Sequence, residues 1–163
     1  MNPVYRLFAT INSFAPTVLR LLLALVFTIH AGQKTVGWMG GEGWTRTLAH
    51  WTAPAPEGLN FPYGLAAAAI LAEAFGAAGM LLGFLTRVAA LGIFCVMIVA
   101  IVFVHGSAGF FAPRGYEYPF TLAGVAFALM CGGGGRFSVD RWLTRALLPP
   151  NSGRLGSYLE PMG

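Results

Sequence analysis

The sequence predicts an all-α membrane protein, a four-transmembrane-helix antiparallel bundle with short interfacial helices at both ends. Of the 163 residues, 56% are hydrophobic and only 10% are charged. Soluble domains carry roughly a quarter charged residues, so this chain has too few to cover a globular surface with solvated side chains. In addition, four continuous apolar stretches each fit the roughly 30 Å hydrocarbon core of a bilayer as helices. We expect residues 1–163 to form a single membrane domain.

The predicted transmembrane helices are residues 17–36, 63–82, 86–105 and 118–134. Helix is expected because every backbone N–H and C=O in lipid needs a partner, and these runs lack the alternation of barrel strands. The link between the second and third spans, residues 83–87, is so short that these two helices are expected to be antiparallel neighbours.

The connection between the first two spans is long and rich in glycine, proline and aromatic residues. It runs from Gly37 to Pro62 and carries Trp38, Trp44, Trp51 and Phe61. Such aromatic residues favour the headgroup level of a bilayer, which suggests a loop lying on the membrane. A lid, or a docking surface for an extracytoplasmic partner, is the alternative interpretation.

Short interfacial helices are predicted at both ends of the chain. Residues 138–147 have an apolar face and a basic flank that is expected to meet anionic lipid, and Ser138 is expected to cap them. The apolar face consists of Val139, Trp142, Leu143 and Leu147, and the basic flank of Arg141 and Arg145. At the amino end, apolar residues recur at helical spacing, namely Val4, Leu7, Phe8 and Ile11.

The basic residues predict the orientation. With a cytoplasmic amino terminus, the inner segments hold Arg6, Arg20, Arg87, Arg136, Arg141, Arg145 and Arg154, and the outer loops hold Lys34, Arg46 and Arg114. This asymmetry favours a multi-pass protein of the cell inner (plasma) membrane with both termini cytoplasmic. The same residues are scattered singly, which argues against nucleic acid as a partner and for the lipid bilayer.

Glu73 is the candidate functional residue, because it lies near the middle of the second predicted span. Small residues recur on its face of the helix, so it is expected to point into the bundle. It is either a buried carboxyl that fixes helix packing or a proton-accepting, quinone-facing group. His30 is its nearest partner by depth, and Arg20 is expected to extend back to the headgroups. Cys95 and Cys131 are expected to be small core residues.

A polar cluster is predicted at the outer third of the bundle. Its members are His30, Gln33, Lys34, His105, Tyr116, Glu117 and Tyr118. Lys34 and Glu117 are either an ion pair or two separately solvated charges. No haem is predicted between His30 and His105, because they lie at unequal depths, and no metal site is predicted for His30, Glu73 and His105, because their spacing is not that of metal ligands.

Three groups of residues make the chain resemble the DoxX family, which includes the small membrane subunits of thiosulfate:quinone oxidoreductase. They are Arg20 with Gly32-Gln33-Lys34, Glu73-x-x-Gly76 with Gly83 and Thr86-Arg87, and Gly115-Tyr116-Glu117-Tyr118-Pro119 with Gly135-Arg136-Phe137-Ser138-Val139-Asp140. The resemblance implies a bacterial four-helix membrane protein associated with redox or respiratory enzymes, with Glu73, Lys34 and Glu117 as the polar positions carried over.

Three functions remain open at this point. The first is an oxidoreductase subunit that offers quinone a crevice while a partner holds the redox centre; no intrinsic cofactor is predicted. The second is a non-catalytic scaffold or assembly subunit, and the third, less favoured, is a small-solute transporter. The expected partners are lipid, other membrane or extracytoplasmic subunits, or further copies of this chain.

Overall fold

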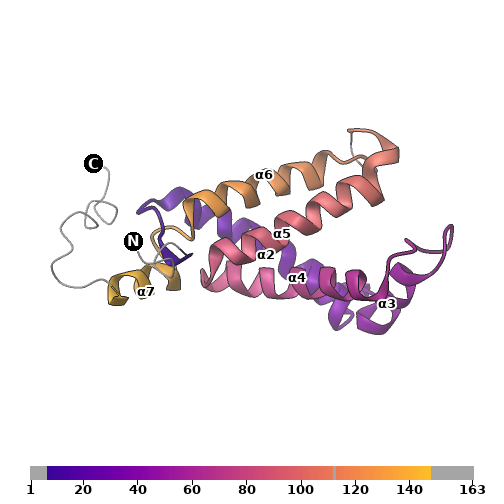
Figure 1. Ribbon diagram of the computed structural model, residues 1–163, viewed down its shortest axis with the longest axis horizontal. Helices are drawn as coiled ribbons and strands as arrows, with labels where there is room; N and C mark the ends of the chain where they lie inside the picture. The colour runs from indigo at the N-terminus through magenta and orange to yellow at the C-terminus, as the bar shows by residue number, and fades with distance from the viewer. Residues whose placement is uncertain (1–6, 112, 148–163) are drawn as a thin grey trace.

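A computed structural model describes residues 7–111 and 113–147, and in these residues every regular element is a helix (Figure 1). The all-α prediction is therefore confirmed. Four helices form the bundle: α2 (Phe14–Thr35), α4 (Tyr63–Leu82), α5 (Thr86–Val99) and α6 (Glu117–Gly132). The shorter elements are α3 (Gly43–Thr52), α7 (Val139–Leu147), two 3-10 turns (Trp38–Gly40 and Gly106–Ala108) and a π-helix (Ala100–His105).

Three of the helical segments are long and apolar enough to cross a membrane: Phe14–Thr35, Tyr63–Leu82 and Thr86–Ala108. The fourth predicted span is also an apolar helix, but α6 has only 16 residues and ends at Gly132 rather than at residue 134. It ends there because Gly133 and Gly135 have φ angles of 75° and 78°, which a right-handed helix excludes.

The four long helices pack in a ring, α2 on α4, α4 on α5, α5 on α6, and α6 back on α2. Small residues bring α4 and α5 close together: a Cβ added to Gly76 would lie 2.8 Å from Ile93 Cγ1. Such close packing is how membrane helices associate without a hydrophobic driving force between them. Large apolar side chains cover the outside instead, as expected of a lipid-facing surface, among them Leu25, Phe75 and Phe127.

Cys95 and Cys131 are also on the outside of the bundle, so their assignment to the core is wrong. Lipid accepts small and large apolar side chains alike, so hydrophobicity alone does not identify the inner face of a membrane helix.

The two ends of the bundle differ (Figure 1). The end that carries α7, the α7 end, joins the beginning of α2 to the end of α6: Ile11 N donates to Gly132 O and Arg136 N to Ser13 O, both at 3.0 Å. The opposite end, the α3 end, carries α3 and the connection from α5 to α6. The described residues therefore begin and finish at the same end of the bundle.

The predicted interfacial helix at residues 138–147 is α7, and Ser138 caps it by accepting from Arg141 N at 3.2 Å. Val139 and Trp142 are exposed as predicted, but Arg141 is buried, so its place on a lipid-facing flank is wrong. The reason is that α7 turns the side of Asp140, Arg141 and Thr144 onto the bundle. In the predicted amino-terminal helix, Leu7 and Phe8 are helical, and residues 1–6 lie outside the described residues.

Arg20 is buried and does not extend to the headgroups, which corrects the prediction. Its guanidinium donates to Met80 O at 2.5 Å, Leu81 O at 2.7 Å and Phe137 O at 2.7 Å. Its Nε donates to Gly134 O at 3.2 Å. The last carbonyls of a helix have no partner within it, so Arg20 completes the end of α4. Arg87 acts similarly, donating to Met130 O in α6 and to Ala9 O.

Asp140 caps the beginning of α5 from α7. Its Oδ1 accepts from Leu85 N at 2.7 Å and its Oδ2 from Thr86 N at 2.8 Å. Burial raises the pKa of the Asp140 carboxyl, while the hydrogen bonds from Thr86 and Leu85 and the charge of Arg20 oppose that rise. The carboxylate therefore serves two otherwise unpaired N–H groups of a helix start.

Replacing Asp140 with alanine should lower the free energy of unfolding by about 1–2 kcal/mol, the usual cost of losing a helix cap. Asp140→Asn should cost about half as much, because the amide keeps one acceptor oxygen. Unfolding in detergent, followed by circular dichroism, measures both. The exposed Glu57→Gln is the control for loss of an acidic charge. Equal stability of Asp140→Ala and Glu57→Gln would contradict the capping role.

Candidate functional site

A cavity of about 300 Å³ lies within the bundle toward the α3 end. It is enclosed by α2, α4, α6 and the junction of α5 with the π-helix, and residues of the connection from α2 to α4 cover it. Its lining is mostly apolar and aromatic. The lining residues are Phe27, His30, Lys34, Trp51, Leu59, Phe61, Ala69, Glu73, Val96, Met97, Val99, Ala100, Val104, His105, Tyr118, Pro119 and Leu122.

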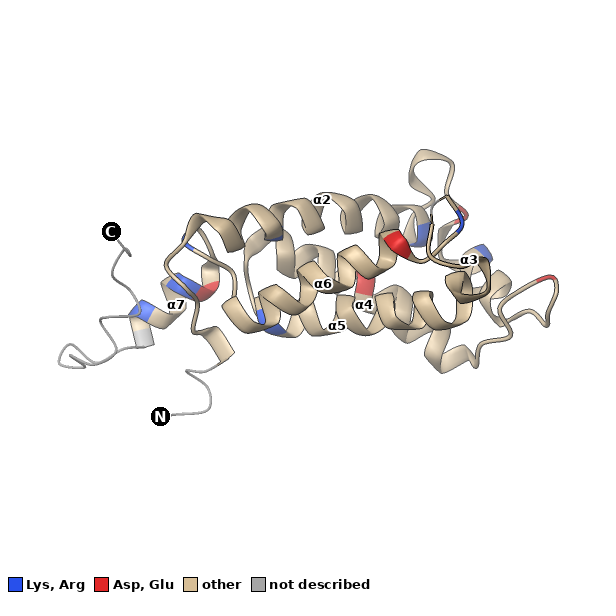
Figure 2. Cartoon of the chain, turned by 90° about the horizontal axis from the view of Figure 1, so that it is seen from above, with Lys and Arg blue, Asp and Glu red and all other residues tan. Residues whose placement is uncertain are grey.

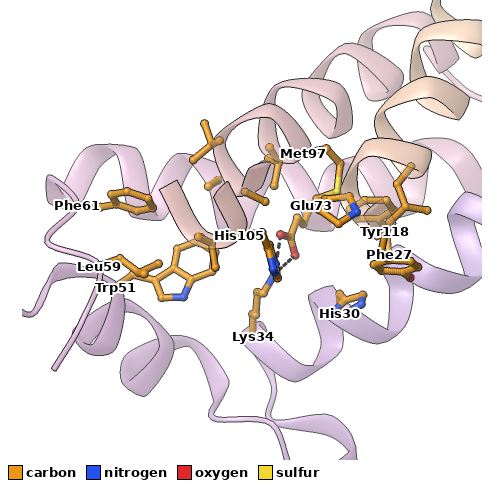
Figure 3. Close-up of a pocket in the computed structure, with 17 residues that line it drawn as sticks. Phe27, His30, Lys34, Trp51, Leu59, Phe61, Glu73, Met97, His105 and Tyr118 are labelled. Atoms are coloured by element: carbon orange, nitrogen blue, oxygen red, sulfur yellow. Dashed lines mark hydrogen bonds and ion pairs between the residues drawn. The ribbon is translucent and has the colours of Figure 1, made fainter. Parts of the chain in front are cut away.

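An ion pair between Lys34 and Glu73 lies in the wall of this cavity (Figure 3). The Lys34 Nζ is 2.5 Å from both carboxylate oxygens. Glu73 is 2% exposed, so it lies in the bundle interior as predicted, whereas the Lys34 side chain is 22% exposed. Lys34 thus pairs with Glu73, so the alternative in which it is a separately solvated charge is wrong.

The directions of the two helices explain this pairing. Side chains on an α-helix lean toward its amino terminus. Because α2 runs toward the α3 end, the Lys34 side chain leans back toward the α7 end. Because α4 runs the opposite way, the Glu73 side chain leans toward the α3 end, and the two side chains meet. When only the depths of the Cα atoms are compared, His30 is the nearest partner of Glu73. When the direction of each side chain along its helix is included, Lys34 becomes the expected partner.

Trp51 of α3 covers the ion pair. The Lys34 Nζ lies 5.2 Å from the centroid of the Trp51 ring, a cation–π contact. Phe61 packs against Trp51 and Phe103, its ring centroid lying 6.4 Å from that of Trp51 and 5.7 Å from that of Phe103. The aromatic residues of the predicted outer loop therefore have different surroundings: Trp51 and Phe61 close the cavity, whereas Trp38 is exposed.

The chain turns from α2 into this cover at glycines with positive φ. Gly37 and Gly43 have φ angles of 79° and 72°, which residues with a Cβ rarely adopt. Between them the chain reverses, and α3 then buries Thr47 and Leu48 against the bundle. The sequence alone shows this only as a run of glycine, tryptophan and proline.

A π-helix forms another wall of the cavity. Residues Ala100–His105 continue α5 with the wider π-type turn, and Ala100, Val104 and His105 line the cavity. The His105 Nδ1 lies 2.8 Å from Arg114 O, which ties this wall to the loop before α6. Such π-type turns occur frequently at functional sites.

The predicted polar cluster is brought together only in part. His30, Lys34, His105 and Tyr118 line one cavity with Glu73, whereas Gln33, Tyr116 and Glu117 are not among its lining residues. Tyr116 packs on Phe110 with ring centroids 5.4 Å apart, and Glu117 N donates to Phe110 O at 2.8 Å. In the described part of the chain, no three His, Cys, Asp or Glu side chains converge as a metal site would require.

Phe27, Trp51, Phe61 and Met97 line the cavity and were not among the predicted site residues. Phe27 stands three residues before His30 and seven before Lys34, so helical spacing places it on the same face of α2. Trp51 comes from α3, Phe61 from the segment before α4 and Met97 from α5, and nothing in their local sequence indicates that they meet.

Comparison with known proteins gives one match. The DoxX family model matches residues 15–106, which is more than half of the chain and includes all of α2 except its first residue, together with α3, α4, α5 and the π-helix. The matched segment contains both members of the Lys34–Glu73 pair. No curated protein and no solved structure matches the chain.

Proposed function

The chain belongs to the DoxX family, and we propose that this membrane protein binds quinone as a subunit of a redox enzyme whose redox centre lies in a partner subunit. The observation that carries the proposal is the ion pair in the wall of an otherwise apolar, aromatic cavity. A quinone ring needs an apolar slot and a few hydrogen-bond donors placed to meet its carbonyl oxygens, which is the usual composition of a small-molecule site.

The geometry leaves a donor for such a ligand. An ammonium group has three N–H donors, and the two oxygens of Glu73 account for two of them. The third N–H of Lys34 is the proposed donor to one quinone oxygen. His30, His105 and Tyr118 line the other walls and are the candidates for the second oxygen. The rings of Phe27 and Trp51 are placed to contact the faces of the bound ring.

The ion pair also supplies a proton-handling group beside the ligand. Reduction of a quinone to a quinol takes up two electrons and two protons. We propose that the partner subunit supplies the electrons. Lys34 and Glu73 would pass protons to the quinone oxygen that Lys34 contacts. Ionisable groups buried in membrane helices usually serve such functions.

The half of the bundle between the cavity and the α7 end is tightly packed, which favours ligand binding over transport of a solute. Between the cavity and the α7 end, the core side chains Leu23, Met80 and Leu129 are at most 1% exposed and pack together. A transporter requires a route through both halves of the bundle. A scaffold function requires neither the cavity nor a donor in its wall, so it is the outcome that would replace the proposal.

We further propose that the α7 end faces the cytoplasm of a bacterial cell and the cavity lies in the outer half of its inner membrane. Figure 2 shows the basic residues gathered at both ends of the bundle. Among the described residues, the α7 end holds Arg20, Arg87, Arg136, Arg141 and Arg145, and the α3 end holds Lys34, Arg46 and Arg114. The excess at the α7 end fits the positive-inside rule. The exposed Trp38 and Phe111 at the other end suit an extracytoplasmic partner.

Menadione, a short-chain quinone, should quench the fluorescence of Trp51 saturably when it is added to the purified protein in detergent. Replacing the ion pair by apolar residues, Lys34→Met with Glu73→Leu, should weaken binding by about 10–100-fold, the value of one hydrogen bond from a charged donor. Trp51→Phe should abolish the signal, which assigns the signal to this ring.

Arg46→Gln is the control, since Arg46 is an exposed cation of the same covering helix and does not line the cavity. Its affinity for menadione should match that of the unaltered protein. If the double variant folds and still binds menadione with unchanged affinity, the ion pair is a packing device and the scaffold function is favoured.

A further inference from the structure

A second pocket lies at the α7 end, far from the cavity that holds the ion pair. Its volume is about 350 Å³, and it opens between the last turn of α4 and the first turns of α7. The residues that line it are Leu82, Arg136, Phe137, Ser138, Val139, Arg141, Trp142 and Arg145. Nothing in the proposed quinone site involves these residues.

Three arginines, Arg136, Arg141 and Arg145, are among the residues that line this pocket. No acidic residue is among the described residues of its lining. The nearest carboxylate along the chain, Asp140, does not line the pocket; it accepts from Leu85 N and Thr86 N at the start of α5. The three arginines give the described lining of the pocket a positive charge, which would attract an anion placed in it.

The surroundings of Arg141 are consistent with this charge. Burial lowers the pKa of the Arg141 guanidinium, and the neighbouring charges of Arg145 and Arg136 lower it further. Arg136 is positioned by aromatic rings, its Cζ lying 5.0 Å from the ring centroid of Phe14 and 5.9 Å from that of Phe137. These contacts hold the planar guanidinium of Arg136. A guanidinium can pair with phosphate oxygens through two parallel hydrogen bonds.

The rim of the pocket is apolar and exposed. Phe137 is 62% exposed and Trp142 is 69% exposed, and Leu82 lies beside them at the end of α4. A tryptophan at this level lies among lipid headgroups, with acyl chains on its membrane side. The ligand thus needs a phosphate for the arginines and hydrocarbon for the rim.

From this arrangement we propose that the pocket binds an anionic phospholipid, with its phosphate between Arg136, Arg141 and Arg145 and an acyl chain along Phe137 and Trp142. The apolar rim distinguishes this ligand from free phosphate, which would gain nothing there. Arginine-rich pockets at the cytoplasmic side of membrane helices bind anionic headgroups through the same charge-assisted contacts. The assignment does not depend on the quinone proposal, because a different end of the bundle is involved.

Native mass spectrometry of the full chain tests the proposal. The protein is titrated with phosphatidylglycerol and, separately, with phosphatidylcholine of the same acyl chains, which differ in net headgroup charge. We expect phosphatidylglycerol to be retained preferentially. Arg136→Gln with Arg145→Gln should reduce this preference by about fivefold for each arginine removed. Both arginines are exposed, so the fold does not rest on them.

Arg46→Gln with Arg114→Gln is the matched control, because it removes two exposed cations from the opposite end. It should retain the preference for phosphatidylglycerol. An equal loss in this control would overturn the proposal in favour of non-specific charge. Equal retention of both lipids would overturn it as well. Displacement of the lipid by millimolar inorganic phosphate would show that free phosphate is the ligand and would also overturn it.

Discussion

Lys34→Met should lower the free energy of unfolding by about 3–5 kcal/mol, the cost of removing one partner from a buried ion pair. The large effect is expected because Glu73 is 2% exposed and would keep its carboxylate in the bundle interior without the ammonium that now meets both oxygens. Unfolding in mixed micelles, titrated with SDS and followed by circular dichroism, gives the difference in stability.

Removing Glu73 instead of Lys34 should lower the free energy of unfolding by less. Glu73→Leu leaves the ammonium of Lys34, but this side chain is already 22% exposed and stands in the last turn of α2. Its flexible stem allows the charge to move to the headgroup level, so a loss of about 1–2 kcal/mol is expected. This asymmetry between the two single variants is itself a test of the burial that the structure gives each partner.

The double variant Lys34→Met with Glu73→Leu should be close to the unaltered protein in stability, because a buried ion pair replaced by apolar side chains costs little. Arg46→Gln, in the same covering helix, should change stability by less than about 0.5 kcal/mol. A double variant as unstable as the sum of the singles would show that no coupling exists between the two residues. A stable double variant also permits the menadione experiment to be interpreted, since loss of binding would then not reflect unfolding.

The sequence was sufficient for the four bundle helices and for the inward direction of Glu73. Apolar length identified the segments that became α2, α4 and α5, and the small residues around Glu73 identified the inner face of α4. Both inferences rest on properties local to one helix. The partner of Glu73 is a property of two helices and of their relative direction, and depth along one axis was too coarse to select Lys34 over His30.

The aromatic cover illustrates the same limit. Trp51 was visible as one of several tryptophans in a loop, and the local composition suited a headgroup location equally well. Its contact with Lys34 depends on how α3 folds back over the bundle, which follows from the backbone at Gly37 and Gly43 and from the burial of Leu48. Cavity residues that come from separate elements were not predictable from their neighbours in the chain.

The misplacement of Arg20 has a different cause. A long cationic side chain near a helix end normally extends to the headgroups, which was the expectation. In the structure, four backbone carbonyls from two distant segments, the end of α4 and residues 134–137, converge around it. Helix ends buried in protein require such partners. Counting the carbonyls left unpaired at the ends of α4 and α6 would have indicated a role for Arg20 and Arg87 inside the protein.

Arg20→Ala should therefore destabilise the protein by about 4 kcal/mol, because hydrogen bonds from a charged donor contribute about 1.5–3 kcal/mol each and the carbonyls would lose their partner together. Arg20 is 3% exposed, so water cannot readily replace its guanidinium. Unfolding in mixed micelles measures the loss, and hydrogen exchange should show faster opening at the last turn of α4 than at its first turn.

Arg20→Lys separates charge from geometry. An ammonium carries the same charge but offers three donors from a single point, whereas the guanidinium reaches the carbonyls of Met80, Gly134 and Phe137 in different directions. We expect lysine to recover about half of the loss. Arg114→Ala, an exposed arginine at the opposite end, should be neutral. Full recovery by lysine would mean that charge alone stabilises this end, and equal losses for lysine and alanine would mean that the planar fork of donors is indispensable.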